Sequence, residues 1–151
     1  MDKDYWERRK FIEFCFANEA EIVRACWEKR LDPNIPKSIG HGSGISKPTE
    51  MQAIKNSLPL DFVTVKKTAI YTPELWLRLV TITKAEYNYK QGGILYKLKY
   101  QQDFLRAKVM KEMKISKTRY HQLIIEIINF AMNKAELNNL RYGIVGVSKK
   151  E

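Results

Sequence analysis

Residues 104–124, FLRAKVMKEMKISKTRYHQLI, decide the fold of this chain, because their pattern predicts a short helix, a tight turn and a second helix. Apolar side chains recur there at the spacing that closes a small core between two crossing helices. These side chains are Val109, Met113, Ile115, Tyr120, Leu123 and Ile124. Ser116 stands where the second helix needs a cap, since its hydroxyl can accept a free backbone N–H of the first turn. The stretch therefore predicts a helix-turn-helix.

Most side chains left on the outer surface of this motif are hydrogen-bond donors. Lys117, Thr118, His121 and Gln122 would face outward at the start of the second helix, where a recognition helix contacts base edges. Gln122 carries the group for a bidentate contact to adenine, and Lys117 the group for guanine. The remaining basic side chains are expected to hold phosphates. The predicted DNA-binding residues are Lys108, Lys111, Lys114, Ser116, Lys117, Thr118, Arg119, His121 and Gln122.

Positive charge is concentrated in the half of the chain that carries this motif. The 151 residues have a formal net charge of +10. Residues 1–75 hold 12 Lys and Arg against 11 Asp and Glu, whereas residues 76–151 hold 15 against 6. Such an excess favours nucleic-acid binding without showing that a base sequence is read. The alternative is a lysine-rich, solvated surface with no polyanionic partner.

The N-terminal third predicts helix followed by loop. Apolar positions over residues 4–31 recur at three and four, which indicates one long helix or two helices with a break near Asn18. This part is either an arm for dimer contacts or a helix packed on the rest of the chain. Residues 32–48 contain three glycines and three prolines and predict a loop. Helix is expected again over Glu50–Ser57.

The remaining segments complete an all-α prediction. Residues 58–72 are expected to be loop or irregular helix, since Phe62–Val65 looks strand-like but has no visible partner strand. A helix is predicted over residues 73–90, broken by Gly92 and Gly93. The predicted organisation is an N-terminal helical arm (1–31), a Gly/Pro-rich loop (32–48), a helical middle segment (49–93), a helix-turn-helix domain (94–141) and a loose tail (142–151).

The sequence contains no recognisable catalytic or metal-binding pattern. The two histidines, His41 and His121, lie at no ligand spacing from a Cys or a carboxylate. Cys15 and Cys26 fall on an apolar helix face and are expected to be buried thiols. We therefore expect no enzyme activity, no metal and no cofactor. No apolar run reaches the roughly 20 residues that span a bilayer, so a cytoplasmic location in a bacterial host cell is expected.

Two segments resemble a known group of proteins. Leu95–Tyr100 (LYKLKY), the helix-turn-helix and a long final helix from Ser116 to about Asn138 together resemble a sigma-factor region-four domain. Ser116–Leu123 (SKTRYHQL) is similar to its promoter-binding recognition helix. Residues 34–56, in which a Gly-rich loop leads into ISKPTEMQAI, resemble the RinA/ArpU group of phage transcriptional regulators. The turn of such a helix-turn-helix usually has Gly where this chain has Lys114, because the residue there tends to adopt positive φ.

The resemblance implies a phage or mobile-element transcriptional regulator. Its expected partners are double-stranded promoter DNA, bacterial RNA polymerase and, through the N-terminal helix, a second copy of the chain. Two alternatives stay open. In one, the chain is a protein-interaction module in which Trp6, Phe11 and Trp27 bind a polymerase or phage assembly protein. In the other, it is a DNA-packaging protein like a small terminase subunit, which also pairs a helix-turn-helix with helical oligomerisation.

Overall fold

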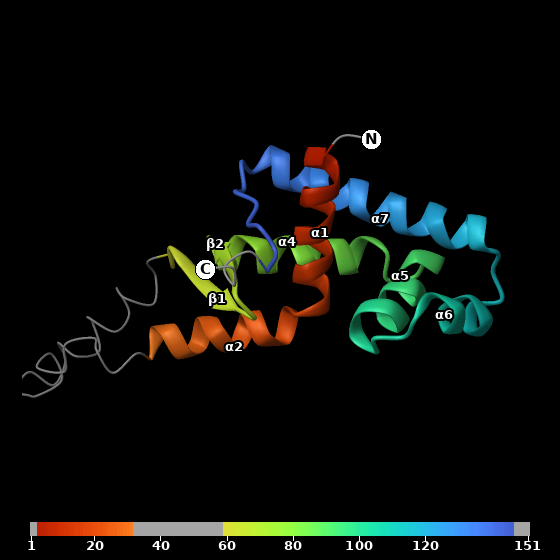
Figure 1. Cartoon of the computed structure of the whole chain (residues 1–151), viewed down its shortest axis with the longest axis horizontal. Coiled ribbons are helices and arrows are strands. Elements are labelled where there is room, and N and C mark those ends of the chain that lie inside the picture. Colours follow the sequence, from red (N-terminus) through yellow and green to blue (C-terminus); the bar gives the residue numbers. More distant parts are fainter. Residues whose placement is uncertain (1–2, 32–58, 147–151) are drawn as a thin grey trace, which may run out of the picture.

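The computed structural model describes residues 3–31 and 59–146, and over these ranges the chain is mostly helical with one small sheet (Figure 1). The predicted loop at 32–48 and the predicted helix at Glu50–Ser57 lie outside the described residues. The described elements are α1 (Lys3–Ala17), α2 (Glu19–Arg30), β1 (Phe62–Val65), β2 (Thr68–Tyr71), α4 (Pro73–Glu86), α5 (Gln91–Tyr96), the π-helix η2 (Lys97–Gln101), α6 (Arg106–Met113) and α7 (Lys117–Leu137).

The N-terminal residues form two helices with a break at Asn18, which was one of the two predicted alternatives. The Asn18 side chain donates to the Phe14 carbonyl at 2.9 Å and is itself buried. Helix α1 crosses α7 and contacts α4 and η2 (Figure 1). Its Phe11, Ile12 and Phe16 side chains are fully buried. These helices are therefore part of the core and do not project as an arm.

Residues 62–71 form an antiparallel hairpin, so the prediction of loop or irregular helix is wrong. Val63 and Ile70 pair across the strands, and both side chains are buried. The connection is Lys66 and Lys67, at φ of 49° and 66°. Positive φ at both central residues is the geometry of a type I′ turn, for which Asn-Gly is the usual signal. Because two lysines occupy the turn, the sequence lacks the Asn-Gly signal that would have predicted the hairpin.

The connection between α4 and α5 lies earlier than predicted. Helix α4 begins at Pro73 and ends at Glu86, and both glycines expected to break it lie inside α5. A Cβ atom at Gly93 would lie 2.1 Å from the carbonyl oxygen of Tyr87. The glycine therefore allows the start of α5 to approach the end of α4 closely, and it permits a sharp turn between the two helices.

The C-terminal segment is packed against the core as far as Gly146, where a loose tail was predicted. The rings of Tyr142 and Trp76 meet edge to face with centroids 5.2 Å apart. The backbone N–H of Gly146 donates to the hydroxyl of Thr68 at 3.1 Å. This part of the tail thus closes over the hairpin and α4, and residues 147–151 lie outside the described ranges.

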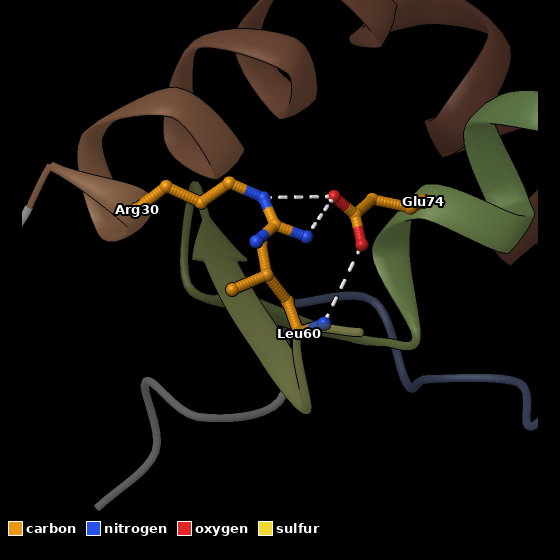
Figure 2. Close-up of polar contacts among 3 residues, drawn as sticks. All are labelled: Arg30, Leu60 and Glu74. Carbon is orange, nitrogen blue, oxygen red and sulfur yellow. Dashed lines mark hydrogen bonds and ion pairs between the residues drawn. The ribbon is translucent and has the colours of Figure 1, made fainter. Parts of the chain in front are cut away.

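An ion pair joins α2 to α4 beside the entry to the hairpin (Figure 2). The Arg30 guanidinium donates through Nε to Oε2 of Glu74 at 3.0 Å, and through Nη2 to the same oxygen. The other carboxylate oxygen of Glu74 accepts the backbone N–H of Leu60 at 3.4 Å. One carboxylate therefore holds the end of α2, the start of α4 and the approach to β1 together.

Candidate nucleic-acid interface

Helices α6 and α7 are joined by three residues, Lys114 to Ser116, at the end of the molecule opposite the hairpin (Figure 1). The backbone N–H of Ile115 donates to the carbonyl of Met110 at 3.1 Å, and that of Lys114 to Lys111 at 3.3 Å. Lys114 has φ 58° and ψ 48°. These two bonds around a left-handed residue make a Schellman motif, which satisfies carbonyls that the end of α6 leaves free.

Ser116 caps α7, as the sequence predicted. Its backbone is extended, with φ −80° and ψ 167°, and its hydroxyl accepts the backbone N–H of Arg119 at 3.1 Å. The first turn of α7 contains no acidic residue. No carboxylate in that turn therefore offsets the positive end of the helix dipole, and the side chains of Lys117 and Thr118 are exposed there.

The apolar side chains predicted to form the core of the motif are buried or half-buried, although α6 packs mainly on α5 and η2. Val109, Tyr120, Leu123 and Ile124 are buried, and Met113 and Ile115 are half-buried against the same cluster. Further along α7 the buried positions continue to Ala135. Because one face of α7 is buried, its geometry of 3.6 residues per turn fixes which positions face solvent.

Eight of the nine predicted DNA-binding residues are exposed on this part of the surface: Lys108, Lys111, Lys114, Ser116, Lys117, Thr118, Arg119 and Gln122. Thr118 and Gln122 face directly away from the buried face of α7. Position 121 falls on the flank toward α6, and there His121 is half-buried. Its ring lies edge-on to Tyr120 with centroids 5.3 Å apart.

Arg119 makes hydrogen bonds that the sequence did not predict. Its Nε and Nη2 donate to Oε1 of Gln91 at 3.1 and 2.8 Å, which ties α7 to the start of α5. Its Nη1 donates to Oε1 of Gln122 at 3.4 Å. The Gln122 oxygen that a bidentate adenine contact requires is therefore already accepting a hydrogen bond. Gln91 is 28 residues distant in sequence, so no local pattern indicated this contact.

The basic character of the region extends beyond the predicted residues. Lys97, Lys99 and Arg106 add to it, so residues 97–122 contain eight Lys and Arg against two Asp and Glu. Within the described part of the chain, none of these eight cations forms an ion pair with a carboxylate. We call this set the basic surface: Lys97, Lys99, Arg106, Lys108, Lys111, Lys114, Lys117 and Arg119.

An open cleft of 460 Å³ borders the basic surface between α1, η2, α6 and α7. Arg9, Lys99, Arg106 and His121 line it, together with the carboxylate of Glu13. Oε1 of Glu13 lies 3.7 Å from Nε of Arg9, so these two charges offset each other. Lys99 and Arg106 then leave an excess of positive charge on the walls. The cleft is thus a place where an anionic group could sit beside the start of α7.

Other reactive chemistry is sparse in the described residues. Cys15 and Cys26 are free, buried thiols, as predicted. Burial raises the pKa of Cys26 from 9.0 to about 11, and the charge of Glu74 adds to the rise while that of Arg30 opposes it. Over residues 3–31 and 59–146 no cluster of His, Cys, Asp or Glu could hold a metal ion. In these same ranges, no helix has the length and apolar character needed to cross a membrane.

No family model fits the sequence, and neither the curated proteins nor the solved structures include a significant match. The function of the chain therefore has to be inferred from the arrangement of α6, α7 and the basic surface.

Proposed function

We propose that this chain is a transcriptional regulator of a phage or mobile element, and that α6, the turn and α7 bind promoter DNA as a helix-turn-helix. The observation that carries the proposal is the basic surface. Eight cations without carboxylate partners among the described residues lie on η2, α6, the capped turn and the exposed start of α7. Phosphate neutralisation by such cations supplies most of the affinity of a DNA-binding protein. The resemblance to sigma-like regulators agrees with this arrangement.

In the proposed complex the start of α7 enters the major groove. Thr118 and Gln122 face outward and would reach base edges. Lys117 lies on the flank toward α6, at a hollow that Lys111 also lines, and would reach a base from that side. Ile125, one turn further along, is 43% exposed and is suited to contact a thymine methyl group. The sequence pattern did not identify Ile125, because an isoleucine in α7 is expected to be buried. Arg119 orients Gln122 through the hydrogen bond described above.

The remaining basic residues would contact phosphates and set the register. Lys108 and Lys111 extend from α6, and Lys114 from the turn. The Lys108 ammonium also lies 4.1 Å from the centre of the Phe104 ring, which directs its side chain. His121 is placed by the cleft and not on the outward face, so in this proposal it contacts the backbone of the duplex.

A salt titration tests the proposal. Binding of the full chain to a random-sequence duplex is measured by fluorescence anisotropy over a range of salt concentrations. Lys111→Ala should weaken binding to every sequence and reduce the slope of log K against log salt by about one unit. Arg24→Ala is the matched control, since Arg24 is an exposed cation of α2 outside the basic surface. Undetectable affinity at low salt, or equal slopes for the two variants, would refute the proposal.

Sequence reading is tested separately with Gln122→Ala. Sequences selected by the wild type and by the variant from a random DNA library are compared. We expect the preference to relax at one base position, with a loss of about 1–3 kcal/mol of discrimination there. If both proteins select the same sequences with the same stringency, Gln122 does not read a base.

A protein-interaction module remains the second candidate, because two tryptophans are exposed on the N-terminal helices. Trp6 is 44% exposed and Trp27 is 62% exposed, whereas Phe11 is fully buried and cannot contact a partner. Capture of bacterial RNA polymerase by the full chain distinguishes the two functions. Capture that persists in a Lys108→Ala, Lys111→Ala double variant but fails in Trp27→Ala would favour the interaction module.

A further inference from the structure

A partly open cavity of 230 Å³ lies between the end of α4, α5, η2 and the middle of α7. Its apolar walls are Tyr87, Tyr96 and Ile127. Its polar walls come from α4, the connection after α4 and η2, with Lys84 on α4 and Lys97 and Gln101 on η2 among them. Apolar walls with a few convergent polar groups are the usual composition of a small-molecule site.

The hydroxyl of Tyr96 has no hydrogen-bond partner among the described residues, although the residue is only 3% exposed. An unpaired buried hydroxyl is destabilising, and such a group in a native structure calls for an explanation. Burial raises the pKa of Tyr96, and the charge of Glu19 raises it further. Glu19 in turn binds Lys84 on the cavity wall at 2.8 Å, so one of the charges that act on the Tyr96 hydroxyl is held by a residue of the cavity.

The π-helix places two of the polar groups. Lys97 and Gln101, its first and last residues, both line the cavity. Single turns of π-helix are rare and occur frequently at functional sites. Lys97 is exposed and forms no ion pair among the described residues. Since Glu19 compensates the charge of Lys84, these three groups leave a net charge of +1 beside the cavity.

We propose that this cavity binds a small organic monoanion, a carboxylate on a short flat or apolar body. The carboxylate would accept hydrogen bonds from the Lys97 ammonium and the Tyr96 hydroxyl. The body would lie between the ring of Tyr87 and the side chain of Ile127. A single net positive charge matches a monoanion better than a doubly charged phosphate. The site is separate from the basic surface, apart from Lys97 at its border, and does not depend on DNA binding.

Titration with benzoate tests the site directly. The full chain, labelled with ¹⁵N, is titrated without DNA, and amide shifts are followed by NMR. We expect saturable shifts at residues 83–101 and near Ile127. Benzamide has the same shape without the charge, so it should bind at least about fivefold more weakly. Absence of saturable shifts with benzoate, equal binding of the two compounds, or tighter binding of inorganic phosphate would overturn the proposal.

Two variants separate a ligand site from a packing defect. Lys97→Gln should lower benzoate affinity about fivefold, while Lys111→Gln, an equal charge change on α6, should leave it unchanged. Tyr96→Phe should lower benzoate affinity and also raise the melting temperature of the free protein, because it removes an unpaired buried hydroxyl. Higher stability with unchanged benzoate affinity would show that the hydroxyl has no part in binding. Unchanged affinity in Lys97→Gln would refute the assigned role of the cation.

Discussion

Replacing Lys114 by glycine should stabilise the protein. Lys114 has φ 58° and ψ 48°, the left-handed conformation that Cβ disfavours. Relief of that conformation contributes about 1–2 kcal/mol. The greater backbone entropy of glycine in the unfolded chain offsets about 0.5–1 kcal/mol of this gain. We therefore expect Lys114→Gly to raise the free energy of unfolding by roughly 0.5–1 kcal/mol, and the melting temperature by about 2–3 °C.

The matched control is Lys111→Gly, which makes the same substitution three residues earlier, inside α6. Glycine in a helix interior costs about 1 kcal/mol, so this variant should be less stable than the wild type. Both variants lose one positive charge of the basic surface, which removes net charge as an explanation for any difference. Urea and thermal unfolding followed by circular dichroism measure the two free energies. If Lys114→Gly is destabilised as much as Lys111→Gly, the assignment of Lys114 to a left-handed cap is wrong.

Three further predictions concern the helix cap, the hairpin and a thiol. Ser116→Ala should lower the free energy of unfolding by about 1 kcal/mol, and Ser116→Asn should preserve it, as measured by urea unfolding. Lys66→Asn should raise the unfolding midpoint, because asparagine tolerates the observed φ of 49°, whereas Lys66→Val should lower it. With its pKa raised to about 11, Cys26 should react with a thiol reagent at pH 8 about a hundredfold more slowly than an unperturbed thiol. Its rate in the folded protein should still be rising near pH 10.

Features that depend on neighbouring residues could be predicted from the sequence. The apolar spacing over residues 104–124 identified the side chains of α6, the turn and α7 that are buried or half-buried, and Ser116 was identified as the cap of α7. The break at Asn18 was one of two alternatives because an asparagine near the middle of a long helical pattern competes with the backbone for hydrogen bonds. In each case the signal comes from residues that lie close together in the sequence.

Features that depend on distant contacts could not be predicted. The hairpin has lysines in a turn that normally contains Asn and Gly, so only pairing and burial of the strands hold it. The half-buried state of His121 depends on Tyr120 and on a cleft partly formed by α1. The hydrogen bonds from Arg119 to Gln91 link α7 to α5, and these two helices lie close together because both pack on the same hydrophobic core. A single sequence carries no signal for these distances.

Lys114 is less favourable for stability than glycine would be, and it is also one of the residues proposed to bind DNA. A glycine there would make the more stable cap, yet the chain has a lysine on the exposed turn between α6 and α7. Function often retains residues that lower stability. If Lys114 binds a phosphate in the proposed complex, Lys114→Arg should keep both the DNA affinity and the salt slope, since it keeps the charge. Lys114→Gly should then bind DNA more weakly although it is the more stable protein. Equal DNA binding by the two variants would mean that the charge at this position has no functional role, and that the strained lysine is merely tolerated.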